Sequence, residues 1–389
     1  MKICHVINSL NRGGAESHLL ELVKAQNNEG LLIDIVVIGK DNKNIFSIEK
    51  ELIECSNNIF RLNGPRMFNL FSYFELKNII KKNEYDIIHS HQPRSDYMIY
   101  MLKKYLFAKT LFKWIVSIHG KYDSYLDNNF KKVFKLYFFK KLIKSWTFAD
   151  SVIVISHEVE IWLKNLTKKI QPHVINYWIS IKEHKNINLN QNLSIGFLGR
   201  LNKNKGIEDL IESLNNLPIQ FNFVIGGHGS TSYIDFLKDQ MTPELNEKTT
   251  FLGYIEDQSK FFEGIDIFIF PSYSEGLGLV LLEAMSYQKI CITRNLEPMN
   301  QFINENNGYL FSNNIDLKDA ILNASNDLKN EKIYLEKIKN IKKVLEIYDI
   351  KNVFPKILEV YKLWMNINFK KLNPNGRNIG RIIILLNVT

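Results

Sequence analysis

Short runs of branched apolar residues alternate with longer amphipathic segments along most of this chain. In the first half, these runs lie at Ile3–Ile7, Leu32–Ile38, Asp86–His89, Trp114–Ile118 and Val152–Ile155. Apolar runs without polar alternation are typical of strands that helices cover on both faces. Strands of this kind that alternate with helices predict a parallel, doubly wound α/β sheet.

The same alternation begins again after a polar stretch, Ser180–Asn192, which we interpret as an interdomain linker. Further strand-like runs follow at Ile195–Leu198, Phe221–Ile225, Asp266–Phe270 and Ile290–Thr293. The chain of 389 residues also exceeds the roughly 250–300 residues at which one core usually stops growing. The predicted fold class is therefore α/β, with two Rossmann-like doubly wound domains that face each other across a cleft.

The predicted domains are residues 1–180 and residues 190–350, followed by a C-terminal helix and tail over residues 351–389. The helix is expected around Val353–Trp364 and could pack back on the first domain. The tail is basic over Phe369–Ile379 and apolar over Ile382–Val388. The sequence leaves open whether this tail forms an extra strand, an interface segment or neither.

Cysteine usage and apolar pattern restrict the compartment and the cofactors. Cys4, Cys55 and Cys291 are scattered, and no CxxC or Cys/His cluster occurs, so we predict neither disulfides nor a metal cofactor. No apolar run approaches the ~20 residues that span a bilayer. The first run breaks at Asn8, as expected for a strand rather than a signal peptide. We therefore expect a cytoplasmic protein.

The densest chemical pattern is the segment Phe270–Met285, where a strand leads through a short loop into a helix. Gly276 and Gly278 would allow backbone amides to come close to a ligand. The positive end of the new helix would attract an anion such as a diphosphate. We predict that Gly276, Leu277, Gly278 and Leu279 bind a phosphorylated donor.

Two carboxylates flank that loop. Glu275 lies in the loop itself, whereas Glu283 lies in an otherwise apolar helix. A carboxylate on an apolar helix needs good hydrogen-bond donors, and sugar hydroxyls are suitable ones. We predict a catalytic role for Glu275 and donor binding by Glu283. The alternative is an ordinary acidic helix start, with Glu283 paired to a neighbouring base.

A second pattern, Gly199–Ile207, places two cations after a strand of the second half. Arg200 and Lys205 could clamp a diphosphate and stabilise the charge of its departure, and Gly199 would lie beside them. The alternative is a solvated basic turn.

Further loops follow strands in both halves. Gly13 and Gly14 follow the first strand, and Gly227 follows Phe221–Ile225; each permits a close ligand approach, although plain tight turns explain them equally well. The first loop lacks GxGxxG, so dinucleotide binding is weakly supported. His119 follows Trp114–Ile118, and His89 and His91 stand at the end of the run that begins at Asp86, so all three lie at the expected ligand-binding edge of the sheet. For each histidine, a structural role is an equally good explanation.

Together, these segments resemble the GT-B retaining glycosyltransferases often called family 4, over the chain up to about residue 365. The most specific match is an E-x7-E arrangement, formed here by Glu275 and Glu283. The resemblance implies that Glu275 contacts hydroxyls of the donor hexose and that Glu283 binds the ribose of the nucleotide. It further implies contacts of Arg200 and Lys205 with the diphosphate and of His119 with the donor sugar.

The resemblance also assigns Gly13 and Gly14 to a loop near donor phosphate and acceptor, and Asn307–Phe311 to a late signature that closes the donor domain. Two segments depart from the family pattern. The run Ile175–Ile179 keeps only the Asn of a Pro-Asn-Gly-Val-Asp-like sequence. Arg294–Met299 lacks the usual Gly-Gly, which leaves the donor less well defined than the reaction class.

The excess of positive over negative charge lies entirely in the first half. Residues 1–185 contain 28 Lys and Arg against 18 Asp and Glu, which suggests an anionic partner there. The segment Phe130–Trp146 holds six lysines and no acid, and could lie on an anionic membrane. The alternative is an ordinary domain helix with a buried aromatic side. No nucleic-acid-binding motif is recognisable.

We therefore predict a metal-independent glycosyltransferase with a nucleotide-diphosphate sugar as donor substrate. Its acceptor would be a glycan, linked to a polyprenyl diphosphate, in bacterial surface polysaccharide synthesis at the inner face of the plasma membrane. The alternatives are a sugar-nucleotide epimerase of the same fold and a non-catalytic sugar-nucleotide-binding protein.

Overall fold

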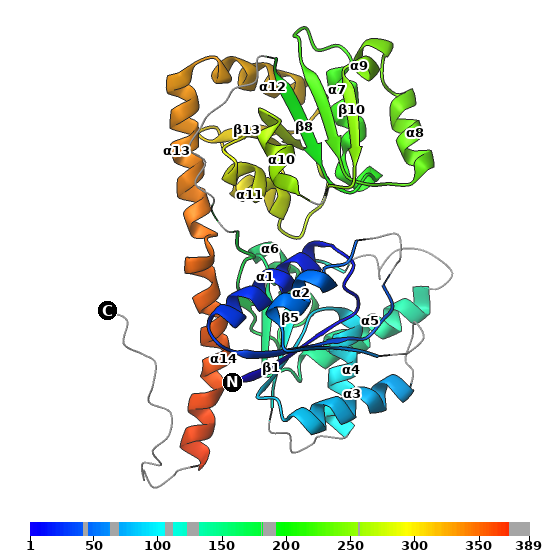
Figure 1. Ribbon diagram of the computed structural model, residues 1–389, viewed down its shortest axis with the longest axis vertical. Coiled ribbons are helices and arrows are strands. Elements are labelled where there is room, and N and C mark those ends of the chain that lie inside the picture. Colours follow the sequence, from blue (N-terminus) through cyan, green and yellow to red (C-terminus); the bar gives the residue numbers. More distant parts are fainter. Residues whose placement is uncertain are drawn as a thin grey trace.

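A computed structural model describes residues 1–41, 46–62, 70–105, 112–122, 132–179, 181, 192–255 and 257–372, with only the backbone described at 132–135 and 363–372. Two parallel sheets, each flanked by helices, form two units that lie end to end (Figure 1). The prediction of two Rossmann-like α/β domains is confirmed.

The first sheet has seven strands in the order β3-β2-β1-β4-β5-β6-β7. Its strands are β1 Lys2–Ile7, β2 Leu32–Val37, β3 Asn58–Arg61, β4 Ile87–Ser90, β5 Lys113–Ile118, β6 Ser151–Val154 and β7 His173–Val174. The parallel register of β1 and β4 places His5 beside His89. The strand order reverses at this pair, and ligands of open α/β sheets bind beside such a switch point.

Six helices are described for the first domain: α1 Gly14–Asn28, α2 Glu49–Cys55, α3 Leu70–Asn83, α4 Pro93–Tyr105, α5 Lys132–Trp146 and α6 His157–Leu166. The apolar residues of α1 illustrate why these helices form. Leu19, Leu20, Leu22 and Val23 are buried on one side of the helix, as the period of 3.6 residues requires.

The second sheet has six strands in the order β10-β9-β8-β11-β12-β13. They are β8 Ser194–Leu198, β9 Asn222–Gly226, β10 Thr249–Gly253, β11 Ile267–Phe270, β12 Ile290–Arg294 and β13 Gly308–Phe311. The connecting elements are the 3-10 turns η2 Lys203–Lys205 and η3 Met299–Gln301 and the helices α7 Ile207–Leu214, α8 Thr231–Asp239, α9 Pro243–Glu247, α10 Gln258–Glu263, α11 Leu279–Ser286 and α12 Asn314–Leu328.

Two long helices, α13 Glu331–Ile347 and α14 Ile350–Leu372, run along one side of both domains (Figure 1). Val353, Phe354 and Ile357 of α14 belong to a buried cluster with Ile3 and Ile87 of the first sheet. The C-terminal helix therefore returns to the first domain, and it continues to Leu372, well beyond the expected end at Trp364. The remaining tail lies outside the described residues.

The strands expected from the sequence are present, with ends shifted by at most one residue. Four strands were not expected: β3, β7, β10 and β13. They are short, and β3 and β10 mix exposed and half-buried residues, so they lack a continuous apolar run. Of the proposed linker Ser180–Asn192, only Ile181 and Asn192 lie within the described residues.

Candidate active site

Loops of the two domains meet at two predicted site residues. His119 follows β5 in the first domain, and Gly276 follows β11 in the second. A Cβ atom added at Gly276 would lie 2.9 Å from the His119 carbonyl oxygen and 3.1 Å from Cδ1 of Ile155. Because a side chain would collide with that carbonyl, glycine allows the two domains to come together here.

Two predicted catalytic residues of the second domain form an ion pair. Lys205 Nζ donates to Glu275 Oε1 at 2.5 Å across 70 positions of sequence. The two side chains are 22% and 14% exposed, respectively. The pair therefore presents a cation and a carboxylate at the carboxyl ends of β8 and β11, which are neighbours in the sheet.

A close backbone contact brings the basic turn to the glutamate loop. Gly206 ends the turn η2 with φ +65°, and a Cβ there would lie 2.2 Å from the Pro271 carbonyl oxygen. The Tyr273 N–H donates to the Asn204 carbonyl oxygen at 2.9 Å. The position of Lys205 beside the Glu275 loop therefore depends on a glycine that can adopt a left-handed conformation.

Arg294 supports the same loop from the end of β12. Its Nε donates to the Pro271 carbonyl oxygen at 3.2 Å, and its guanidinium pairs with Asp209 on α7. The guanidinium also lies 4.2 Å from the centre of the Tyr273 ring, whose hydroxyl donates to Asp209 at 2.6 Å. The sequence had marked Arg294 only as a departure from the family pattern; it is a buried support of the Glu275 loop.

Arg200 connects the basic turn with the first domain. It is exposed and interacts electrostatically with Glu16, near the start of α1. Burial raises the pKa of Glu16, while a hydrogen bond from Gln92 at 2.7 Å and the charge of Arg200 act in the opposite direction. Gly13 caps α1, and a Cβ at Gly14 would meet nothing within 4 Å. A ligand can therefore approach the backbone at Gly14.

Glu16 was not among the site residues predicted from the sequence, although its place in the first turn of a helix after Gly13 and Gly14 could have indicated it.

Gly199 and Gly227 meet each other. Gly227 has φ +127°, and a Cβ there would lie 1.8 Å from the Gly199 carbonyl oxygen. This close packing of β8 and β9 is sufficient to require glycine at Gly227, and a donor-binding role for either residue stays a prediction.

A second contact joins the domains through aromatic rings. Phe46 of the first domain stacks on Tyr254 of the second, with ring centroids 3.9 Å apart and an interplanar angle of 12°. The centre of the Tyr254 ring also lies 6.2 Å from the centre of the His228 ring, and His228 belongs to the loop that follows β9. The stack therefore holds the two domains beside the candidate site.

The helix after the glutamate loop begins as expected. Gly278 caps α11 in a left-handed conformation with φ +87°, and Leu277 before it is buried. Leu279 is the first helical residue, and Glu283 lies one turn further on, partly buried. The start of a helix favours an anion, and donor binding by Gly276, Leu277, Gly278 and Leu279 stays a prediction.

His119 is held through both ring nitrogens. Nε2 lies 3.2 Å from Nδ1 of His91, and Nδ1 contacts the Tyr177 hydroxyl. Burial lowers the pKa of His119 to about 3, so the ring is neutral. His18 lies against Tyr177, with ring centroids 4.1 Å apart. The predicted contact of the His119 ring with a donor sugar would therefore compete with these bonds, whereas its carbonyl oxygen faces Gly276.

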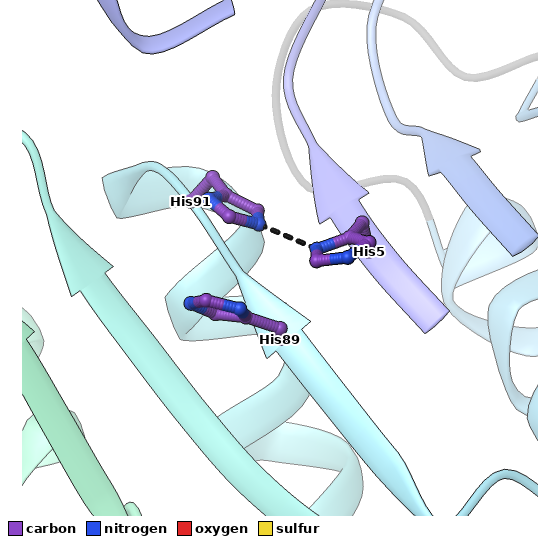
Figure 2. Close-up of side chains that lie close together, drawn as sticks. All are labelled: His5, His89 and His91. Atoms are coloured by element: carbon purple, nitrogen blue, oxygen red, sulfur yellow. Dashed lines mark hydrogen bonds between the residues drawn. The ribbon is translucent and has the colours of Figure 1, made fainter. Parts of the chain in front are cut away.

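Three further ring nitrogens lie beside this site. His5, His89 and His91 each offer one nitrogen within 4.8 Å of the others, and Figure 2 shows the three rings at the ends of β1 and β4. Such a group could hold a metal ion. The prediction of a metal-independent enzyme stays a prediction.

The helix proposed to lie on a membrane is partly a core helix. Phe139, Leu142 and Trp146 of α5 are buried, as the alternative interpretation required; Phe130 and Lys131 lie outside the described residues. Across the part of the chain that the structure describes, no helix combines the length and the apolar character needed to cross a membrane.

Two family models match consecutive parts of the chain. The model described as Glycosyltransferase Family 4 matches residues 12–181, and the model described as Glycosyl transferases group 1 matches residues 180–344. The O-antigen biosynthesis glycosyltransferase WclY of Escherichia coli is 24% identical over 320 residues, which is 76% of this chain and 80% of WclY.

A similar relative occurs in Campylobacter jejuni. Its N,N'-diacetylbacillosaminyl-diphospho-undecaprenol alpha-1,3-N-acetylgalactosaminyltransferase is 25% identical over 313 residues, covering 75% of this chain and 81% of its own. Among solved structures, Anabaena Alr3699/HepE in complex with UDP-glucose superposes with a TM-score of 0.74 at 19% identity, covering 92% of this chain and 99% of that one.

The two facing α/β domains thus define a protein of the GT-B class. The chain belongs to the group 1, or family 4, glycosyltransferases and is a transferase enzyme.

Proposed function

We propose that this enzyme is a retaining glycosyltransferase that moves a hexose-type sugar from a nucleotide-diphosphate donor to a glycan acceptor. The observation that carries the proposal is the Lys205–Glu275 ion pair, next to Gly276, where the loop of His119 meets the second domain. A cation suits the diphosphate of such a donor, and a carboxylate suits its sugar hydroxyls. The UDP-glucose complex of HepE, a protein of the same fold, supports this donor class.

Transfer breaks the bond between the anomeric carbon and the diphosphate oxygen, and the acceptor hydroxyl oxygen forms the new bond. Arg200, Lys205 and the backbone amides at the start of α11 would stabilise the negative charge on the leaving diphosphate without a metal ion. In same-face attack, the departing phosphate oxygen takes the proton of the acceptor. Glu275 would orient the donor sugar through its hydroxyls, and Glu283 would bind the ribose.

The proposed acceptor is a glycan linked to a polyprenyl diphosphate, used in synthesis of a bacterial surface polysaccharide at the inner face of the plasma membrane. The names of the C. jejuni and E. coli relatives support an acceptor and a pathway of this kind. The basic first half favours an anionic surface. On α3, Leu70, Phe71 and Phe74 are 75%, 64% and 50% exposed, which suits contact with a membrane interface.

Product analysis with purified protein tests the proposal. UDP- and GDP-hexoses are first screened for thermal stabilisation, since a ligand at ~100 Kd adds about 2.7 kcal/mol. The stabilising donor is then incubated with and without an undecaprenyl-diphosphate-linked glycan, in the presence of EDTA. We expect nucleoside diphosphate to be released only with the acceptor. An isomerised sugar nucleotide formed without acceptor would instead identify an epimerase, and binding without turnover a non-catalytic protein.

A matched pair of variants separates the site from general charge effects. Glu275→Gln should lower the transfer rate by about 100-fold or more, because it replaces a charged carboxylate by a neutral amide and breaks the ion pair that places this side chain beside Lys205. Glu244→Gln is the control: Glu244 forms a comparable 2.5 Å pair with Lys248 on the exposed surface of α9. If both folded variants transfer sugar at the parental rate, the proposed site is wrong.

A further inference from the structure

Three histidines beside the candidate active site form a continuous chain of hydrogen bonds. His5 Nδ1 lies 2.8 Å from His91 Nε2 (Figure 2), and His91 Nδ1 lies 3.2 Å from His119 Nε2. The chain begins at Gln26, whose Oε1 lies 2.8 Å from His5 Nε2. It ends at the Tyr177 hydroxyl, which contacts His119 Nδ1.

A second branch leaves the same glutamine toward the C-terminal helix. Gln26 Nε2 donates to the hydroxyl of Tyr361 on α14 at 3.0 Å. That hydroxyl lies 2.8 Å from His89 Nδ1, and His89 Nε2 lies 2.7 Å from Ser117 Oγ. Gln26, Tyr361 and His89 are completely buried, so their polar atoms must be satisfied within this network.

The amide of Gln26 sets the direction of every bond in the first branch. A neutral imidazole has one N–H and one acceptor nitrogen, and Gln26 Oε1 can only accept. His5 must therefore carry its proton on Nε2, which requires His91 and then His119 to do the same. The Tyr177 hydroxyl must donate to His119 Nδ1. Burial, which lowers the pKa of His5 to about 4, favours the neutral rings that this scheme needs.

The same reasoning extends to the second branch. Tyr361 accepts from Gln26, so its own proton goes to His89 Nδ1, and His89 carries its proton on Nε2 and donates to Ser117. All four histidines of the network therefore share one tautomer. Turning the Gln26 amide over would reverse every donor, so the four rings would change tautomer together.

A metal ion is not needed to explain these rings. Both nitrogens of His5, His89 and His91 already have a hydrogen-bond partner. A metal bound between His5 and His91 would remove the proton that joins Nδ1 to Nε2 at 2.8 Å. We therefore interpret the cluster as a hydrogen-bonded network.

We propose that His91 is a positioning residue for the transfer reaction, because its hydrogen bond holds His119 in one tautomer and one ring orientation. The effect on catalysis rests on the proposed function, whereas the tautomers follow from the hydrogen bonds alone. Fixing the His119 ring also fixes the backbone carbonyl that faces Gly276 between the domains. Through Gln26 and Tyr361, the network ties this loop to α14, the helix that returns from the second domain to the first.

Selective labelling of histidine rings with 15N in the full-length protein tests the network directly. A ring nitrogen that carries a proton and a bare acceptor nitrogen give separate NMR signals, so each tautomer can be assigned. We expect one shared tautomer for His5, His89, His91 and His119. Different tautomers among the four in the unaltered protein, or stoichiometric zinc found by elemental analysis, would overturn the inference.

Two variants then separate the two bonds of His91. In His91→Asn the amide reaches the position of Nδ1 and keeps a partner for His119; in His91→Gln it reaches that of Nε2 and keeps a partner for His5. We expect His119 to retain a single tautomer only in His91→Asn. The kcat should fall by about 100-fold in His91→Gln, with a much smaller change in donor KM, because the reacting groups are misplaced.

His89→Gln is the matched control, because His89 lies at the end of β4, two positions before His91, and has no bond to His119; His119 should keep its tautomer. An unchanged His119 in both His91 variants contradicts the positioning role. If neither the parent nor any variant transfers sugar, the proposed function fails, while the NMR measurement still decides the network.

Discussion

Lys205 and Glu275 are joined by a 2.5 Å contact between Nζ and Oε1, and each belongs to a different loop of the second domain. One member is suited to phosphate and the other to hydroxyl groups. A donor that engages both must exchange their mutual pair for contacts of its own. In the proposed site, binding of the diphosphate and binding of the sugar would therefore be coupled through one ion pair.

Removal of the lysine should affect chemistry more than folding. We expect Lys205→Met to lower kcat by about 10²–10³-fold, the usual cost of losing one group that stabilises developing charge. Lys248→Met, which breaks the exposed pair on α9, is the control and should retain the parental rate. A folded Lys205→Met enzyme with the parental kcat would contradict the role of Lys205 on the leaving diphosphate.

The domain junction at Gly276 should be intolerant of any side chain. Gly276→Ala would place a Cβ 2.9 Å from the His119 carbonyl oxygen, and we expect it to lower the free energy of unfolding by about 1–3 kcal/mol, as overpacking does. Gly14→Ala has open space and should leave stability nearly unchanged. Urea unfolding of both variants measures the difference, and equal losses would show that the junction is looser than described.

The aromatic stack between the domains should favour their approach. Phe46→Ala removes the ring that lies 3.9 Å from Tyr254, and such a pair contributes about 0.5–1.5 kcal/mol. We expect a larger radius of gyration in small-angle X-ray scattering. Phe71→Ala, which removes an exposed ring on α3, should leave the radius unchanged. No difference between the two variants would mean that the stack has no part in holding the domains together.

The sequence predicted both sheets because their central strands are continuous apolar runs, and that pattern does not depend on partners. It missed β3 and β10, where exposed residues interrupt the apolar run. The predicted site residues lie in loops that follow strands. The topology therefore places Glu275 and Lys205 at the carboxyl ends of the strands of the second sheet, and His119 at the corresponding edge of the first sheet. The residue types in each loop, a few positions apart in the sequence, were enough to predict which chemical groups these residues suit.

The histidine network could not be predicted in this way. The bond from Gln26 to Tyr361 spans 335 positions, and neither residue stands in a recognisable motif. His89 and His91 were visible after their strand, but their partners depend on the packing of α1 and α14 on the sheet. Long-range pairing of single polar residues leaves no periodic signal in the sequence.

The support that Arg294 gives the glutamate loop should be measurable as stability. Arg294→Met removes the buried partner of the partly exposed Asp209, and we expect a loss of about 1–3 kcal/mol, typical of leaving such a group without its partner. Lys24→Met breaks the exposed pair with Glu21 and should cost less than about 0.5 kcal/mol. Chemical unfolding of the two variants distinguishes them; a cost for Arg294→Met as small as for Lys24→Met would contradict the support.

The buried histidines should make the fold sensitive to mild acid. Burial lowers the pKa of His5 to about 4 and that of His119 to about 3, and it lowers the pKa values of His18, His89 and His91 in the same direction. In the unfolded chain a histidine has a pKa near ~6.5. Between roughly pH 6.5 and pH 4 the unfolded chain therefore binds more protons, and the free energy of unfolding falls as the pH falls.

Two buried carboxyl groups act in the opposite direction. Burial raises the pKa of Asp96 to about 7 and also raises the pKa of Glu16, so the folded state binds these protons first and gains stability as the pH falls. Each group changes the free energy by at most about 1.4 kcal/mol per pH unit, and five histidines outweigh two carboxyls. Urea unfolding at about pH 7.5 and about pH 5.5 should show lower stability at the acid value. His91→Asn, with one titrating ring fewer, should show a smaller difference, whereas equal stability of the parent at both values would mean that these rings are not buried as neutral groups.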